Sequence, residues 1–433
     1  MREGVTQMQA VAVVTTPSLT VGLLPRRASR TNQMSKLPRN WKIKELSEVA
    51  TIQTGLAKGK NNLKNPVSLP YLRVANVQDG YFDLSEIKTI EVSSAEIERY
   101  RLKPNDVLLT EGGDFDKLGR GHIWRGQIDP CLHQNHIFVV RPNPQILKPE
   151  FLTALTASHY GRTYFLSCSK QTTNLASVNS TQLKQFPVLL PPIREQEEIA
   201  RIVGCWDRAI EQAEKLVVTK TSIKRGLVQQ LLSGGKRFAE FGNKAWQEAH
   251  FGDFLTESRI PGSNGVDAKK ITVKLYGKGV VEKAEKLLGS ANTKYHIRRT
   301  GQFIYSKLDF LNGAFGIITE QLDGYESTLD LPAFDIDERL DPLWLFYFVS
   351  RSHFYKSYAN AAKGGRKARR VQPDEFLKTK ARFPSIEEQR RIAAVLNACD
   401  KEITLLKQQL DALKRQKQGL MQKLLTGQIR VKV

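Results

Sequence analysis

Two long segments of the chain carry apolar residues at the spacing of a helix that packs against another helix. In residues 385–427, two series of mostly apolar positions each recur every seven residues, and residues 192–236 repeat this spacing with weaker apolar content. A heptad pattern sustained over about five repeats predicts the seam of a coiled coil. The predicted coiled-coil seam residues are Ile199, Val203, Trp206, Ile210, Val217, Leu227, Leu231, Ile392, Leu396, Cys399, Ile403, Leu406, Leu410, Leu413, Leu420 and Leu424.

The two segments are copies of one another. Residues 192–200 (PIREQEEIA) resemble residues 385–393 (SIEEQRRIA), and residues 224–234 resemble residues 417–427, both at an offset of 193 residues. Because no gap separates the two matches, the stretch between them has one fixed length, as a continuous helix requires. Each copy begins after proline and ends near glycine, which are start and stop preferences of helices.

Lysine interrupts the apolar seam at related positions. Lys224 and Lys417 occupy the same seam position in the two copies, and Lys220 lies one turn before Lys224. A seam lysine can fix the register of a coiled coil at some cost in stability. The alternative is a frayed position, or a lysine whose amine reaches solvent.

A second correspondence precedes each helix. Trp41 with residues 46–49 (LSEV) resembles Trp246 with residues 251–254 (FGDF), at an offset of 205 residues. The order is therefore globular part, helix, globular part, helix, and the second globular part is shorter by 12 residues. Two helices of about 40 residues, each about 60 Å long, would bury their apolar stripes most simply against each other. A connection through a globular part lets them run antiparallel.

The predicted fold class is α+β: two domains of mixed α/β type, separated by a pair of long antiparallel coiled-coil helices and related by an internal pseudo-twofold repeat. The expected boundaries are a disordered leader or mis-assigned start at residues 1–36, a first domain at 37–191, a first long helix at 192–236, a second domain at 237–384, a second long helix at 385–427 and a tail at 428–433.

Short apolar runs bounded by turn signals predict irregular sheets in both domains. The expected strands are residues 71–74, 107–110 and 136–140 in the first domain, and residues 302–305 and 314–318 in the second. One helix is expected in each domain, at residues 149–166 and near residues 342–358.

The charge of the chain favours a polyanionic partner. There are 66 Lys and Arg against 44 Asp and Glu, a formal net charge of +22, and nucleic acid is the first candidate partner for such an excess. No run of about 18 apolar residues occurs, so no membrane span is expected. Four cysteines without a CxxC pair favour neither a disulfide framework nor a zinc ribbon, and they fit a reducing cytoplasm best.

The chain lacks the motifs that DNA-acting enzymes need. No GxxxxGK[ST] loop occurs, and Pro191-Pro192 lacks the polar and aromatic neighbours of a base-methylating loop. Asp374, Glu375 and Lys378 superficially suggest a nuclease site, but no second acidic strand accompanies them, so a turn and short helix start are expected. We therefore expect no catalytic residue and no cofactor.

One cluster of metal-ligand residue types is present in the first domain. Cys131, His133 and His136 alternate into an apolar strand, but no fourth ligand is evident, so structural use is expected and no metal site is predicted.

Several segments, taken in order, resemble the specificity subunit of type I restriction-modification enzymes. In the first domain these are residues 70–80 (PYLRVANVQDG), residues 102–108 (LKPNDVL) and the loop 111–121. In the second domain, residues 305–309 (YSKLD) and 312–316 (NGAFG) resemble an alternative type of the same domain. The Glu-Gln-x-x-Ile-Ala segment at each helix start is the most recognisable mark, and the resemblance covers about residues 37–430.

The resemblance implies a division of labour among several chains. Each of two target-recognition domains would read one half of a split site on double-stranded DNA. The long helices would hold the half-sites at a fixed separation and dock two modification (methyltransferase) subunits. Methyl transfer and cleavage would belong to partner chains, with the restriction (motor and nuclease) subunits joining through the complex.

The candidate DNA contacts are basic and polar loops. The sharpest is residues 363–370 (KGGRKARR), which an offset of 193 places on residues 170–177 (KQTTNLAS), where amides and hydroxyls suit base edges. For every candidate, the alternative is an ordinary solvated surface turn. The predicted DNA-binding residues are Lys58, Lys60, Asn61, Lys117, Arg120, Lys170, Gln171, Thr172, Thr173, Asn174, Lys274, Tyr276, Lys278, Lys363, Arg366, Lys367, Arg369 and Arg370.

Two other functions stay open at this point. One is a self-contained DNA methyltransferase or endonuclease, against which the missing cofactor loops argue. The other is a coiled-coil scaffold that does not act on DNA and whose globular parts bind proteins.

Overall fold

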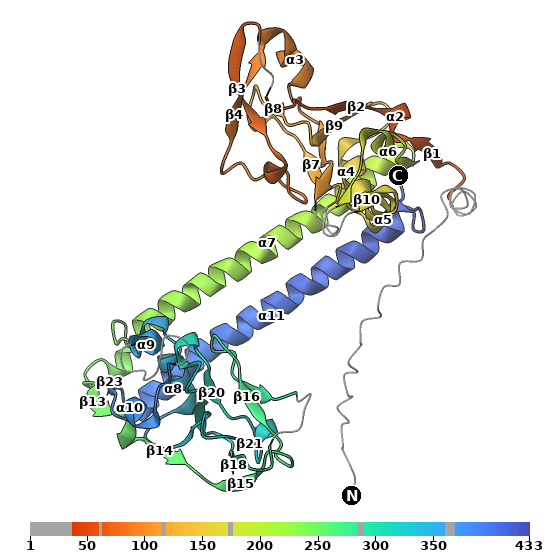
Figure 1. The fold of residues 1–433 in the computed structure, drawn as a ribbon. Helices are drawn as coiled ribbons and strands as arrows, with labels where there is room; N and C mark the ends of the chain where they lie inside the picture. The colour runs from red at the N-terminus through yellow and green to blue at the C-terminus, as the bar shows by residue number, and fades with distance from the viewer. Residues whose placement is uncertain (1–36, 60–62, 114–117, 172–175, 285–289, 360–368) are drawn as a thin grey trace, which may run out of the picture. The chain divides into compact units, whose positions relative to one another are not determined.

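The computed structural model describes residues 37–433 except 60–62, 114–117, 172–175, 285–289 and 360–368 (Figure 1). The chain forms two compact units. Unit 1 comprises the chain up to Ile210 together with Ala412–Val433, and unit 2 comprises Glu211–Asp411. The leader predicted at residues 1–36 lies outside the described residues. Both units combine helices and strands, in agreement with the predicted α+β class.

Unit 1 is built on a four-stranded antiparallel sheet. Its strands are β2 (Ala50–Thr54), β9 (Ile137–Pro142), β5 (Val107–Thr110) and β7 (Gly121–Ile123), hydrogen-bonded in the order β2-β9-β5-β7. Apolar side chains from β5 and β9 are buried together with the helices that cover the sheet. The strands predicted from short apolar runs at residues 107–110 and 136–140 therefore form the centre of this sheet.

Unit 2 repeats this sheet. Its strands are β14 (Leu255–Ser258), β22 (Ala333–Ile336), β19 (Phe303–Tyr305) and β20 (Phe315–Ile317), in the order β14-β22-β19-β20. The core beside it is strongly aromatic, and the Phe303 and Phe376 rings stack at a centroid distance of 5.5 Å. The two sheets thus share one strand order although their core side chains differ.

Smaller elements complete each unit. Unit 1 adds β1 (Lys42–Glu45), α2 (Leu46–Val49), β3 (Pro66–Leu72), β4 (Lys88–Ser93), α3 (Ile97–Tyr100), β6 (Gly112–Gly113), β8 (Leu132–His133), β10 (Lys170–Gln171), β11 (Ala176–Ser177), α6 (Ser180–Lys184) and β12 (Pro187–Leu190). Unit 2 adds β13 (Gln247–His250), β15 (Pro261–Asn264), β16 (Ile271–Val273), β17 (Val280–Glu282), β18 (Lys294–Ile297), β21 (Glu326–Ser327), α10 (Pro373–Leu377) and β23 (Lys380–Phe383).

The prediction of a single helix in each domain is wrong: each unit has two shorter helices in that region. Unit 1 has α4 (Pro149–Ala157) and α5 (His159–Cys168), and unit 2 has α8 (Pro342–Val349) and α9 (Ser352–Ser357). In unit 1 the break lies at Ser158, whose backbone is extended and whose hydroxyl accepts a hydrogen bond from the Gly161 amide at 3.3 Å. A serine in that conformation caps the start of a new helix and so ends the old one.

The two long helices are α7 (Ile193–Leu231) and α11 (Ile386–Leu425). Each directly follows a strand of a two-stranded antiparallel sheet, β12 paired with β1 before α7, and β23 paired with β13 before α11. The registers of these two sheets are equivalent: Lys42 lies opposite Leu190, and Gln247 lies opposite Phe383. The sequence repeat is therefore also a repeat of local structure at the start of each helix.

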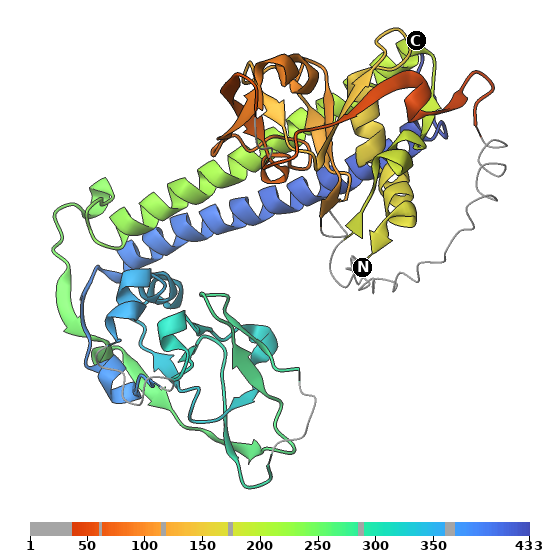
Figure 2. The ribbon, with the colours of Figure 1, turned by 45° about the horizontal axis from the view of Figure 1, so that its top comes forward.

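Within each unit, segments of α7 and α11 lie side by side in both views (Figure 1, Figure 2). In unit 1, Lys417 of α11 pairs with Asp207 of α7. In unit 2, Lys224 of α7 pairs with Asp400 of α11 at 2.5 Å, and Lys220 pairs with Glu402 at 2.7 Å. As the residue number rises along α7 it falls along α11, so the two segments run antiparallel.

The seam lysines thus have acidic partners on the opposite helix. Lys224 and Lys417 are related by the offset of 193, and so are their partners Asp207 and Asp400. The same ion pair is therefore made twice, with lysine on α7 in one unit and on α11 in the other. Every one of the sixteen predicted seam positions is buried or half-buried.

A buried glutamate anchors the start of each long helix. In unit 1, the Arg430 guanidinium donates two hydrogen bonds to Glu195, at 2.6 and 2.8 Å, and the Trp41 indole donates a third at 3.1 Å. In unit 2, Arg237 donates to Glu388 at 2.9 and 2.7 Å, and the Trp246 indole at 3.1 Å. We call each arrangement of Glu, Arg and Trp the glutamate clamp. It ties the first turn of the helix to the globular part beside it.

The neighbouring glutamine makes a second tie. In unit 1, the Gln196 side-chain amide donates to the Ile146 carbonyl at 2.9 Å, and its oxygen accepts from the Lys148 amide at 2.9 Å. In unit 2, Gln389 bonds Arg339 and Asp341 in the same way, at 3.1 and 2.8 Å. These contacts fix the loops that lead into α4 and α8, and they give the Glu-Gln pair of the repeated motif a structural role.

We expect Glu195→Gln to lower the local unfolding free energy of unit 1 by about 2 kcal/mol, because a neutral amide loses charge-assisted bonds at a buried site. Amide hydrogen exchange of residues 195–203 measures this change. Glu197→Gln is the matched control, since its side chain is half exposed and its ion pair with Lys148 contributes under about 1 kcal/mol. Equal losses in the two variants would contradict the clamp.

Candidate nucleic-acid interface

Two loops that sequence analysis singled out come together in unit 1. β6, β11 and β10 form one three-stranded sheet, so the loop that follows β5 pairs with the segment around residues 170–177. The Val178 amide donates to the Glu111 carbonyl at 2.8 Å and continues this pairing. Lys170 and Gln171 form β10, whereas four of the candidates, Lys117, Thr172, Thr173 and Asn174, lie outside the described residues.

The turn at residues 78–81 lies next to the same loops. The Gly80 amide donates to the Gly121 carbonyl at 3.2 Å, and the Gln78 amide donates to the Tyr81 carbonyl at 3.0 Å. Arg120 is half-buried, and its guanidinium donates to Gln78 Oε1 at 3.3 Å and to the Val74 carbonyl at 3.3 Å. Arg120 therefore joins two loops to each other, a role that its sequence context did not indicate.

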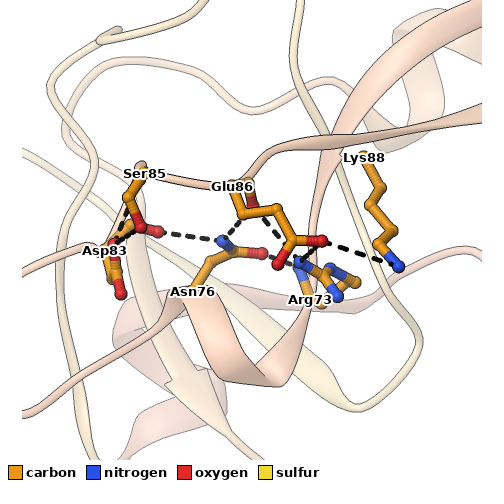
Figure 3. A network of polar contacts seen from close by, with 6 residues as sticks. All are labelled: Arg73, Asn76, Asp83, Ser85, Glu86 and Lys88. Atoms are coloured by element: carbon orange, nitrogen blue, oxygen red, sulfur yellow. Dashed lines mark hydrogen bonds and ion pairs between the residues drawn. The ribbon is translucent and has the colours of Figure 1, made fainter.

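A polar network fixes the loop that carries this turn (Figure 3). Asn76 is only 3% exposed; its Nδ2 donates to the carbonyls of Asp83 and Glu86, at 2.9 and 3.0 Å, and its Oδ1 accepts from the Arg73 amide at 2.9 Å. The Glu86 carboxylate pairs with Arg73 at 3.5 Å and with Lys88 at 3.6 Å. One buried amide thus holds both ends of the loop and leaves its tip at the surface.

The tip exposes residues that sequence reasoning missed. Tyr81 is 58% exposed, and Asp79 beside it pairs with Arg162 of α5. A Gln-Asp-Gly turn signal marked this position in the sequence, but nothing in it indicated that Tyr81 would project. The remaining described candidate of unit 1, Lys58, is exposed and lies 5.8 Å from the centroid of the Tyr71 ring, while Lys60 and Asn61 lie outside the described residues.

In unit 2 the described candidates lie along one segment. Lys274, Tyr276 and Lys278 occupy the turn between β16 and β17, and all three are exposed. The Tyr276 amide donates to the Asn312 carbonyl at 2.9 Å. The Val371 amide donates to the Lys307 carbonyl at 3.0 Å, so the chain just after the basic run is held by residues 307–312 as well.

Only the end of that basic run is described. Arg370 pairs with Asp330 at 3.7 Å, and Arg369 donates to the Ala359 carbonyl at 2.9 Å. Lys363, Arg366 and Lys367 lie outside the described residues. The Asp330 loop is positioned by a residue that sequence reasoning missed, the fully buried Arg298, which donates to the Leu331 carbonyl at 3.1 Å.

The possible metal ligands of unit 1 point to different partners. Burial raises the pKa of the Cys131 thiol to about 12 and lowers the pKa of His133 to about 4, and His133 Nδ1 donates to the Ile137 carbonyl at 3.1 Å. His136 Nδ1 instead contacts Glu111 Oε2 at 2.5 Å. Among the described residues, no group of three or more His, Cys, Asp and Glu side chains is placed to hold a metal ion.

The acidic segment before the second long helix forms α10, with Asp374 and Glu375 in its first turn. Asp374 and Lys378 border an open hollow of about 440 Å³, which His250 and Asp253 also line. The expectation of a turn and short helix start at this segment is therefore met by a five-residue helix. Over the described ranges, none of the helices is both long enough and apolar enough to cross a bilayer.

Comparison with known proteins gives matches over almost the whole chain. Residues 38–220 match the family model of the type I restriction modification DNA specificity domain. The crystal structure of the HsdS subunit from Thermoanaerobacter tengcongensis aligns with 91% of this chain and 98% of its own, at a TM-score of 0.53 and 18% identity.

Two curated relatives agree with this assignment. A protein from Methanocaldococcus jannaschii that carries the name MjaX specificity subunit of a type I restriction enzyme is 22% identical over 434 residues, which is 92% of this chain and 96% of the relative. The EcoKI specificity subunit of Escherichia coli is 28% identical over 189 residues, 43% of this chain and 40% of the relative.

These matches first define a class, a protein that contains a type I restriction modification DNA specificity domain at residues 38–220. The same strand order and helix start recur in unit 2, beyond the matched residues. Over most of its length, the chain is similar to the specificity subunits of type I restriction-modification systems.

We expect Asn76→Asp to loosen the loop in Figure 3, because a carboxylate cannot donate to the two carbonyls that Nδ2 now satisfies. Hydrogen exchange of the amides of residues 73–86 should become about 30-fold faster, as expected for a loss of about 2 kcal/mol. Asn143→Asp is the control, since Asn143 Oδ1 accepts from the Gln145 amide at 3.1 Å and a carboxylate preserves that bond. Unchanged exchange in Asn76→Asp would refute this role.

Proposed function

We propose that this chain is the DNA-reading, non-catalytic subunit of a type I restriction-modification complex, and that each globular part reads one half of a bipartite site on double-stranded DNA. The first reader corresponds to residues 37–191 and the second to residues 237–384. Methyl transfer and cleavage belong to partner chains, two modification subunits and the restriction subunits that join them. The net charge of +22 supports a polyanionic ligand.

The observation that carries the proposal is that the two units share one framework of sheet and glutamate clamp but expose different side chains on the turns beside it. Both units have the same order of four strands and the same glutamate clamp. At the turns beside β7 and β20, however, unit 1 exposes Tyr81, whereas unit 2 exposes Lys274, Tyr276 and Lys278. Conserving the frame while changing the exposed side chains is what two readers of different half-sites require.

The long helices supply the second part of the proposal. Thirty-nine residues in α7 correspond to about 58 Å at 1.5 Å per residue, or about 17 base pairs. A rod of that length would hold two readers over a split site with an unread spacer between the half-sites.

The same helices also offer a surface for partner subunits. Leu216, Val218 and Ile223 of α7 and Leu405 of α11 are exposed in unit 2, outside the apolar seam. Exposed apolar side chains on a helix pair support docking of further helices. We propose that the modification subunits dock here.

Inserting one heptad after Gln212 in α7 and one after Asp411 in α11 should lengthen the preferred spacer by about three base pairs, because seven residues add about 10 Å. These positions face each other if the antiparallel register of each unit is continued. Selection of bound sequences from a random duplex pool measures the spacer. A heptad inserted in α7 alone is the control and should impair folding, and an unchanged spacer in the matched double insertion would contradict the ruler.

The function itself is tested by that selection on the unaltered full-length chain, with any subunit that co-purifies with it. A bipartite consensus, bound in a salt-dependent manner, is the expected result. A protein scaffold would enrich no sequence. A self-contained enzyme would methylate or cut the duplex without any other chain, and either outcome would overturn the proposal.

A further inference from the structure

The backbone of Tyr276 is unusual for its residue type. Its φ angle is +60°, and the other non-glycine residues with positive φ in the described chain are two asparagines, Asn65 and Asn105. Asparagine tolerates the left-handed region, whereas a bulky side chain there is a real outlier. Glycine or asparagine would occupy this position without the strain that tyrosine brings, so some property of the ring must offset it.

Packing within the protein does not supply that property. The Tyr276 side chain is 71% exposed. Within the part of the chain that the structure describes, its ring has no aromatic neighbour and its hydroxyl makes no hydrogen bond. An exposed aromatic ring on a strained backbone, without packing contacts in the fold, is typical of a residue that functions in binding.

The strained turn is nevertheless held rigidly. The Tyr276 and Gly277 amides donate to the Asn312 and Gly313 carbonyls at 2.9 and 2.8 Å, and the Lys274 amide donates to the Gly279 carbonyl at 2.9 Å. At the base of the turn, the Gly279 backbone packs against Gly316 of β20 so closely that a Cβ on Gly316 would lie 3.0 Å from the Gly279 Cα. The sheet therefore fixes the direction in which the turn projects.

The charge around the ring suits a phosphate backbone. Lys274 and Lys278 flank Tyr276 on the same turn, both are exposed, and neither has a carboxylate partner among the described residues. A rigid aromatic tip between two free cations combines the two features with which proteins grip and distort DNA, phosphate contacts and an inserted ring.

We propose that Tyr276 is a specificity-determining residue of the second reader, and that its ring inserts as a wedge at a base step of the half-site which that reader binds. Lys274 and Lys278 hold the phosphates on either side of the step. This inference rests on the proposed DNA-reading function and adds to it a named residue and a contact mode. Since the backbone hydrogen bonds of the turn are made in the free protein, the turn is already positioned when DNA arrives.

The test compares stability with DNA binding. Tyr276→Asn removes the ring and relieves the strain, so we expect the melting temperature of the full-length chain to rise by about 2 °C while affinity for the selected duplex falls about tenfold or more. Tyr276→Phe keeps both ring and strain and should match the unaltered chain in both measurements. Leu275→Asn, on the same turn, is the control for a general effect of substitution there.

Permanganate reactivity of thymines placed at each step of the second half-site reports the wedge directly. One step should be reactive in the complex with the unaltered chain and protected in the complex with Tyr276→Asn. Unchanged affinity in Tyr276→Asn would overturn the inference, as would a parallel loss of stability and affinity, which would mark a structural ring. An equal loss in Tyr276→Phe would assign the contact to the hydroxyl and refute the wedge.

Failure of the underlying function gives a different pattern. If the unaltered chain selects no bipartite sequence from the random pool, the DNA-reading proposal falls, whatever the Tyr276 variants do to stability. If the unaltered chain does select a site and Tyr276→Asn selects the same site with the same affinity, the function stands and the wedge falls.

Discussion

The structure depends on two equivalent buried glutamates, one at the start of each long helix. Glu195 and Glu388 each accept three hydrogen bonds, two from an arginine and one from a tryptophan indole, at the first turn of a long helix. A buried charge is costly unless it is paired and hydrogen-bonded, so each glutamate constrains the chain that supplies its donors. In unit 1 those donors come from Trp41, near the start of the described chain, and from Arg430, near its end. The clamp therefore closes unit 1 with segments almost 400 residues apart in sequence.

This constraint separates what the chain keeps constant from what it varies. The sheet order, the clamp and the glutamine tie recur in both units, and they set where the loops beside β7 and β20 emerge. The loops themselves share no pattern of side chains. In unit 1 a buried asparagine organises the loop, and in unit 2 backbone hydrogen bonds to residues 312–313 do so. Backbone strain at an exposed turn residue such as Tyr276 is tolerated because the rest of the unit supplies enough stability to offset it.

The regular, repeated parts of the molecule could be predicted from the sequence, because their signals are local and periodic. The heptad pattern predicts α7 and α11. The offset of 193 residues relates Lys224 to Lys417, whose acidic partners are related by the same offset. The break at Ser158 was not predicted, since a serine within an apolar helical pattern gives no sign of its backbone conformation. The structural contacts of Arg120 and Arg298 were not predicted, for a different reason: their partners are carbonyls and amides far along the chain, and a sequence pattern does not show which cation will be enclosed.

The central claim is that one chain carries two separate readers whose combined footprint is a split DNA site. Sequencing of methylated positions across the genome, in cells with the chain and in cells from which it has been deleted, tests this most directly. The account predicts a methylated sequence with two defined halves around an unspecified spacer of constant length, and its disappearance on deletion. A continuous methylated sequence, or methylation that persists without the chain, would contradict it.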